Sequence, residues 1–164
     1  MIHRLRPEGL EFLDHAPVRQ TCTRALHTPA GLLFEQLAAR PQDWPRWLGF
    51  VRACQYQAAP PYGVGTVRHL RVAGGLRFHE AVIAWDPDER FAYRVEETNA
   101  PGLTAMMEQW KLTPLSQKLT RVSWTMAADG SPPLRLLLRA GRNRVDRTFG
   151  EAMKRLDRSP APPR

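Results

Sequence analysis

The sequence reads PPLRLLLRAGRNRVDRTFGEAMKRL from Pro132 to Leu156, and this stretch predicts one long amphipathic helix. Its apolar and small residues recur at helical spacing on an arc about 120° wide, which leaves the arginines on the other side. That arc is formed by Leu134, Leu137, Leu138, Gly141, Val145, Thr148, Phe149, Ala152 and Leu156. An apolar helical face of this size must be buried, so the preceding sequence has to supply a large apolar partner.

The preceding sequence predicts that partner to be an antiparallel sheet of about seven strands. Alternating apolar residues and turn residues indicate strands at 18–26, 51–58, 65–73, 76–85, 90–98, 104–113 and 119–127. Their connections are short, as in hairpins, and hairpins join antiparallel strands. Two short helices are expected after the first strand, one beginning at Thr28 and Pro29 and one between Asp43 and Trp47.

The hairpins also predict a strand register. A four-residue loop at 86–89 would place Trp85 opposite Arg90. The next pairs along the hairpin would then be Ala84 with Phe91, Val82 with Tyr93 and Glu80 with Val95. A three-residue loop at 73–75 is the better of two readings of the Gly-Gly turn. It would place Leu70 opposite Phe78 and Arg68 opposite Glu80 on the inner face, with His69 outside.

Composition narrows the class of protein. The chain has 164 residues, enough for one domain with a real core, and 43% of them are apolar, which argues against disorder. No run is long enough to span a membrane and the charged start does not resemble a signal peptide, so a cytoplasmic protein is expected. Cys22 and Cys54 are expected to be small buried hydrophobes, because they are too few for a disulfide framework and too far apart for a CxxC motif.

The net charge of +8 lies mostly on and beside the last predicted helix, where residues 132–158 contain eight Lys or Arg and three Asp or Glu. A solvated arginine-rich surface is the simplest explanation. A peripheral contact with an anionic membrane stays open. Nucleic-acid binding is disfavoured, because no aromatic and basic interleaving and no zinc-finger spacing occurs. No metal site, cofactor or oligomeric state is predicted, and the five histidines are scattered.

Several motifs, in order, resemble the START-like (SRPBCC) superfamily and its polyketide cyclase and dehydrase group. The segments HTPA at 27–30 and WPRW at 44–47 resemble the opening of that group. The segment GVGTVR at 63–68, the later Glu80 and the AWDP segment at 84–87 look like its middle part. The strand at 119–126 is similar to its last strand, so the resemblance covers roughly residues 18–157.

The resemblance implies an α+β helix-grip fold, in which a curved antiparallel sheet wraps around the C-terminal helix and encloses a cavity. Cavities of this kind take lipids, sterols, polyketides or plant hormones. In the similar abscisic-acid receptors the loop that matches 73–76 gates the cavity, and the carboxylate that matches Glu80 lies within it. We therefore expect a lead-in at 1–17, a START-like ligand-binding domain at 18–157 and a proline-rich disordered tail at 158–164.

An apolar cavity with a few polar groups predicts a small-molecule site. Arg68, Glu80 and Tyr93 are the candidate catalytic residues, with Glu80 as base, Arg68 stabilising an enolate oxygen and Tyr93 forming a hydrogen bond. A purely structural Arg68–Glu80 pair is the competing explanation, and the inward direction of Glu108 depends on the strand parity. The candidate ligand-binding residues are Leu70, Phe78, Met106, Glu108, Trp110, Trp124, Met126, Val145 and Phe149.

Two classes of function remain open from the sequence. The first is a cyclase or dehydrase that folds a polyketide-like substrate in a dry cavity and supplies an acid and a base. The second is a non-catalytic carrier or sensor of a lipid or other hydrophobic metabolite. The fold is shared by many activities, so it does not choose between them.

Overall fold

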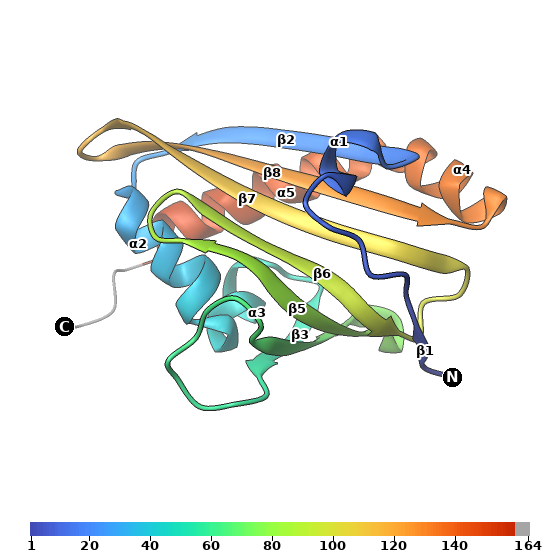
Figure 1. Cartoon of the computed structure of the whole chain (residues 1–164). Helices are drawn as coiled ribbons and strands as arrows, with labels where there is room; N and C mark the ends of the chain where they lie inside the picture. The colour runs from blue at the N-terminus through green and yellow to red at the C-terminus, as the bar shows by residue number, and fades with distance from the viewer. Residues whose placement is uncertain (160–164) are drawn as a thin grey trace.

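A computed structural model describes residues 1–159 of the chain, and its main feature is a strongly curved antiparallel sheet (Figure 1). Seven strands follow one another across this sheet in the order β2-β8-β7-β6-β5-β4-β3, and a short strand β1 pairs with β6. The α+β helix-grip expectation is confirmed. The strands are β1 (His3–Arg4), β2 (Val18–Leu26), β3 (Val51–Tyr56), β4 (Val67–Val72), β5 (Arg77–Asp86), β6 (Arg90–Thr98), β7 (Leu103–Ser116) and β8 (Leu119–Gly130).

Helices lie on both sides of the sheet. The long helix α5 lies against the concave side, behind the sheet in Figure 1, and the short helix α1 lies in front of β7 and β8. The connection from β2 to β3 contains a nearly continuous helical segment that ends in the predicted WPRW motif. The helical elements are α1 (Phe12–His15), α2 (Ala30–Phe34), η1 (Glu35–Ala39), η2 (Pro41–Asp43), α3 (Trp44–Trp47), η3 (Ala73–Gly75), α4 (Pro132–Ala140) and α5 (Arg142–Arg158).

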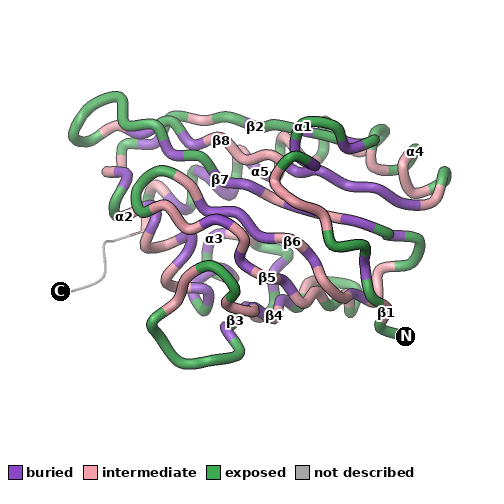
Figure 2. Tube along the Cα trace, viewed as in Figure 1, coloured by how far each residue is buried: buried purple, intermediate pink, exposed green. Residues whose placement is uncertain are grey.

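The C-terminal stretch forms two helices, so the prediction of one continuous helix is wrong. The break falls at Gly141, whose φ of −80° and ψ of 1° depart from helical values, and glycine has low helix propensity. Only α5 buries residues completely, among them Phe149 and Leu156. Leu134 and Leu138 of α4 are half-buried, whereas Leu137 is 67% exposed because the break ends the common apolar arc (Figure 2).

The register of β4 and β5 agrees with the prediction. Leu70 lies opposite Phe78 and Arg68 lies opposite Glu80, with three residues between Val72 and Leu76 in the turn. Arg68, Leu70 and Glu80 are buried. The two-residue reading of this loop, which would have turned His69 inward, is thereby excluded.

The register of β5 and β6 agrees with the prediction only away from their turn. Val82 lies opposite Tyr93 and Glu80 opposite Val95, as expected, but Trp85 lies opposite Phe91 and not opposite Arg90. Asp88 takes a φ of 64°, which closes a tighter turn between Asp86 and Arg90. A β-bulge between Val82 and Ala84 then restores the predicted pairing farther along the strands.

The N-terminal lead-in adds a second apolar layer on the convex side of the sheet. Phe12 and Leu13 of α1 pack there against Ala105, Met107 and Ala127, and Phe12 is 1% exposed. The central part of β7 is therefore buried on both faces. Of the tail expected at 158–164, Arg158 is the last residue of α5, and residues 160–164 lie outside the described residues.

The burial of Phe12 predicts that the lead-in contributes to global stability. Phe12→Ala should lower the free energy of unfolding by about 3 kcal/mol, because it removes a large buried side chain and leaves a cavity. Leu136→Ala is the matched control, since Leu136 is 68% exposed and its loss should cost less than about 0.5 kcal/mol. Urea unfolding measures both values. Equal stabilities of the two variants would show that the lead-in is not part of the cooperative unit.

Candidate functional site

A cavity of about 680 Å³ lies between the concave face of the sheet and α5. This volume is within the range of roughly 300–1,000 Å³ typical of small-molecule sites. Its walls come from the α3–β3 segment, from the four strands β4, β5, β7 and β8, and from α5. The side chains and glycine that line it are Trp44, Trp47, Leu48, Gly49, Phe50, Leu70, Val72, Leu76, Phe78, Glu80, Met106, Glu108, Trp110, Trp124, Met126, Arg144, Val145, Thr148, Phe149, Glu151, Ala152 and Arg155.

The nine residues predicted to contact a ligand all lie in this lining, and Glu108 faces the cavity as the predicted strand parity requires. Glu80 also lines the cavity. The other two candidate catalytic residues do not: Arg68 is 0% exposed and Tyr93 is 1% exposed, and both lie behind the lining. The structure therefore brings two carboxyl groups to the cavity surface and places their partners one layer deeper.

Arg68 is held by an ion pair and by aromatic rings. Its Nε donates a hydrogen bond to Glu80 Oε2 at 2.8 Å, and its Nη2 lies 2.7 Å from the same oxygen. The guanidinium carbon is 4.2 Å from the ring centres of both Trp44 and Tyr93, so the planar cation lies against aromatic faces. These contacts offset part of the cost of burying the charge.

Burial controls the protonation of Glu80. It raises the pKa of this carboxyl from 4.5 to about 7, even though the Arg68 guanidinium lowers it. The nearby Glu108 carboxyl raises the pKa further. Glu80 is thus a group that can gain or lose a proton close to neutral pH.

Glu108 is the centre of a second polar group. Its Oε2 accepts a hydrogen bond from the Tyr93 hydroxyl and another from Trp124 Nε1 at 3.2 Å. Trp110 Nε1 in turn donates to the Tyr93 hydroxyl oxygen at 3.2 Å. Burial raises the pKa of Glu108, and burial together with the neighbouring Glu108 raises the pKa of Tyr93 well above its usual value, so Tyr93 stays a donor.

The two carboxyl groups share one arrangement. Arg68 holds Glu80 through Oε2, and Tyr93 with Trp124 holds Glu108 through Oε2. Among residues 1–159 no hydrogen bond uses Oε1 of either carboxyl. Both Oε1 atoms are therefore available to a molecule in the cavity.

Sequence reasoning missed the residues at the cavity mouth and did not include the two tryptophans of α3 among the ligand-binding residues. Trp44 and Trp47 form part of the wall, each 6.0 Å from the ring centre of Trp110. Arg144, Thr148, Glu151 and Arg155 flank the mouth on α5. Thr148 already belonged to the predicted apolar arc, and the spacing of three or four residues between the four positions was the signal that could have found the other three.

Within residues 1–159 no three His, Cys, Asp or Glu side chains converge closely enough to hold a metal ion. In the same part of the chain, no helix combines the length and apolar character needed to cross a membrane. Cys22 and Cys54 are free thiols and both are buried, as predicted.

Comparison with known proteins identifies the family of this chain. Residues 18–159 match the family described as polyketide cyclase / dehydrase and lipid transport. An uncharacterised protein of Mycobacterium tuberculosis is 33% identical over 127 residues, which cover 77% of this chain and 75% of that protein. An uncharacterised protein of Mycobacterium bovis matches with the same identity and coverage.

Solved structures share the fold at low sequence identity. The Zhui aromatase/cyclase of Streptomyces sp. R1128 superposes with a TM-score of 0.69 at 19% identity, over 85% of this chain and 91% of that one. A START superfamily protein of Mycobacterium smegmatis gives a TM-score of 0.62 at 15% identity, over 84% and 90%. Ginseng major latex-like protein 151 of Panax ginseng gives 0.65 at 12%, over 85% and 95%. These structures show the same fold, and the match over residues 18–159 shows that the chain belongs to the polyketide cyclase / dehydrase and lipid transport family.

Proposed function

We propose that the protein binds a polyketide-like or lipid-like hydrophobic molecule in the cavity and catalyses cyclisation or dehydration of a poly-β-ketone there. One observation carries this proposal. Two buried carboxyl groups, Glu80 and Glu108, are each fixed through Oε2 and leave Oε1 free in a mostly apolar cavity. Apolar walls bind and fold the chain of the ligand, and the two oxygens meet its carbonyl groups.

The environments of the two carboxyls suit them to different steps. Glu80 is paired with Arg68 and has a pKa of about 7, so its carboxylate is a base near neutral pH. Burial raises the pKa of Glu108, and no cationic partner lies within hydrogen-bond distance of it among the described residues, so we assign it as the acid of the pair. Its proton then belongs on Oε1, because Oε2 already accepts two hydrogen bonds.

A balanced reaction follows from these states. Glu80 removes a proton from the carbon between two neighbouring ketones. The resulting enolate carbon attacks a third, more distant ketone of the same chain and forms the ring bond. The alkoxide produced takes the proton of Glu108. In dehydration the two roles reverse: the Glu108 carboxylate removes the next α-proton, and protonated Glu80 gives its proton to the hydroxyl group, which leaves as water, so both carboxyls return to their starting states. No oxidant or reductant is needed.

The roles of Arg68 and Tyr93 differ in this proposal from those expected from the sequence. Neither side chain lines the cavity, so Arg68 does not contact an enolate oxygen directly and Tyr93 does not contact the ligand. We assign them instead as positioning residues. Arg68 orients Glu80 and keeps it ionisable, and Tyr93 orients Glu108.

The second candidate is a non-catalytic carrier or sensor of a hydrophobic metabolite. The observation in its favour is the extent of the apolar lining, in which Leu70, Phe78, Met106 and Met126 surround the few polar groups. Retaining a lipid requires only such a lining and one or two polar contacts. Uptake of ligand without turnover is the behaviour that separates this candidate from the enzyme.

Glu80→Gln and Glu108→Gln should separate binding from catalysis. Each variant should bind the neutral dye Nile red within about twofold of wild type, since glutamine keeps the cavity shape. Each should lose roughly 10²–10⁴-fold in cyclisation of a poly-β-ketone thioester, measured by mass spectrometry of the products, because a proton-transfer group is missing.

Glu97→Gln is the matched control, because Glu97 lies on the outer side of the sheet and bonds Arg4 and His79. It should retain dye binding and turnover. Met126→Trp should reduce dye binding by filling the cavity. Dye binding without cyclisation by wild type would favour the carrier, and dye binding that Met126→Trp leaves unchanged would contradict a ligand in this cavity.

Arg68→Met should destabilise the protein in a pH-dependent way. At pH 8 it should cost about 3–5 kcal/mol of unfolding free energy, because a buried carboxylate loses its partner. Arg68 lowers the pKa of Glu80, so its removal raises that pKa above about 7. The folded state then holds a proton that the unfolded chain releases above about pH 4.5, and stability falls as pH rises through this window.

The loss of unfolding free energy in Arg68→Met relative to wild type, measured by urea unfolding, should therefore be smaller at pH 5 than at pH 8. The double variant Arg68→Met with Glu80→Gln should recover most of the loss at pH 8, because no buried charge remains. An equal deficit at both pH values, without recovery in the double variant, would show that the pair is not ionised in the folded protein.

A further inference from the structure

A second hollow, of about 510 Å³, lies on the outer side of the turn between β4 and β5. We refer to residues 73–76 as the gate loop. Three arginine side chains and the gate loop form the walls of this hollow. The arginines are Arg52 of β3, Arg71 of β4 and Arg77 of β5, and all three are exposed. Three neighbouring strands thus bring three cations to one place.

The sheet register forces this clustering. Arg71 and Arg77 are directly opposite one another in the β4–β5 pairing, on the side away from Leu70 and Phe78. A β-bulge between Val51 and Ala53 places Arg52 as the extra residue beside the strand that carries Arg71. Like charges directly opposite one another destabilise a sheet unless something neutralises them.

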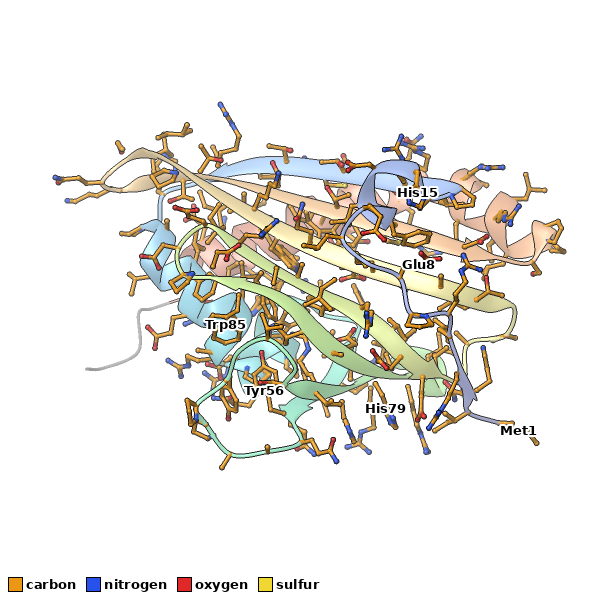
Figure 3. All side chains as sticks on the ribbon, viewed as in Figure 1. Met1, Glu8, His15, Tyr56, His79 and Trp85 are labelled. Carbon is orange, nitrogen blue, oxygen red and sulfur yellow. The ribbon has the colours of Figure 1, made fainter. Side chains whose placement is uncertain are left out.

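Nothing in the described part of the chain neutralises these three arginines. Across residues 1–159 none of their guanidinium groups forms an ion pair or a side-chain hydrogen bond. The nearest acid along β6, Glu97, already bonds Arg4 at 3.2 Å and His79 at 3.3 Å (Figure 3 labels His79). Asn99 instead uses its side chain on the backbone of Arg77 and Gly75. The hollow therefore has an excess of positive charge.

The hollow adjoins the ligand cavity. Val72 and Leu76 line both, so the gate loop is the wall between an apolar space and a cationic one. The arginines at the cavity mouth are less suited to an anion, because Glu151 lies between Arg144 and Arg155 along α5. Among residues 1–159, no acidic residue lines the outer hollow.

We propose that Arg52, Arg71 and Arg77 form an anion-binding site that takes a phosphate group. Guanidinium groups bind phosphate oxygens through paired, charge-assisted hydrogen bonds, and three of them match the charge of a phosphate better than that of a single carboxylate. The phosphate comes either from a free anion or from the head group of an amphiphile whose apolar part enters the cavity. The second source rests on the proposed function, whereas the site itself does not.

Isothermal titration with pyrophosphate at low salt tests the site. The triple variant Arg52→Gln, Arg71→Gln, Arg77→Gln should bind at least about tenfold more weakly than wild type. The charge-matched control replaces the exposed Arg19, Arg121 and Arg147 by glutamine and should bind like wild type. Thermal unfolding without anion shows that the first variant is folded, and its midpoint should equal or exceed that of wild type because like-charge repulsion is relieved.

Equal pyrophosphate affinity in all three proteins, equal loss in both variants, or no binding by wild type would overturn the proposal. Lysophosphatidic acid, used below its micelle concentration, identifies the source of the phosphate. If the phosphate belongs to a head group, Met126→Trp should weaken the binding of lysophosphatidic acid and leave the binding of pyrophosphate unchanged. If the phosphate belongs to a free anion, Met126→Trp should change the binding of neither probe. Pyrophosphate binding together with absent dye binding would refute the cavity ligand and leave the anion site standing.

Discussion

The buried ion pair between Arg68 and Glu80 is the interaction on which the site depends. It joins directly opposite residues of β4 and β5, so it exists only in one strand register. The guanidinium is buried, and it packs against the rings of both Trp44 and Tyr93. The α3 helix, β4, β5 and β6 are thereby connected through one cation, and Glu80 is left with one oxygen toward the cavity.

The cavity exists because α5 presents short side chains where the sheet curves around it. Val145, Thr148 and Ala152 line the space, whereas Phe149 of the same helix packs against Trp110 and Trp124 at ring-centre distances of 6.1 and 6.0 Å. An unfilled space forfeits dispersion contacts, and close packing elsewhere has to supply the stability. Part of that packing lies on the other side of the sheet, where α1 covers β7 and β8. The lead-in thus belongs to the physical basis of the cavity although it is remote from it.

Much of the site could be predicted because strand parity has a period of two. Once Arg68 was set opposite Glu80, the inward direction of Leu70 and Phe78 followed, and the same alternation placed Met106, Glu108 and Trp110 together on β7. Strand parity predicts which face of the sheet a side chain points to, but it does not predict how deeply that side chain is buried. It could not show that Arg68 and Tyr93 lie behind the carboxyls, since depth depends on how far Trp44 and Trp47 reach into the core.

Local backbone geometry also escaped the sequence patterns. The bulge between Val82 and Ala84 compensates for the tight turn at Asp88, so the hairpin prediction failed near the turn and held beyond it. The apolar arc of the last helix continued through Gly141 in sequence, yet the backbone breaks there and exposes Leu137. A helical wheel assumes one straight helix axis, so it cannot reveal a break such as the one at Gly141.

The sequence by itself determined the class of fold, the central strand register and the apolar cavity residues of the central strands and of the last helix, because hydrophobic periodicity and turn chemistry are local properties. The tertiary structure alone decided which polar atoms reach the cavity and which cations gather outside the gate loop. Those features depend on three-dimensional depth and on contacts between strands distant in the chain, and such contacts leave no repeat in the sequence.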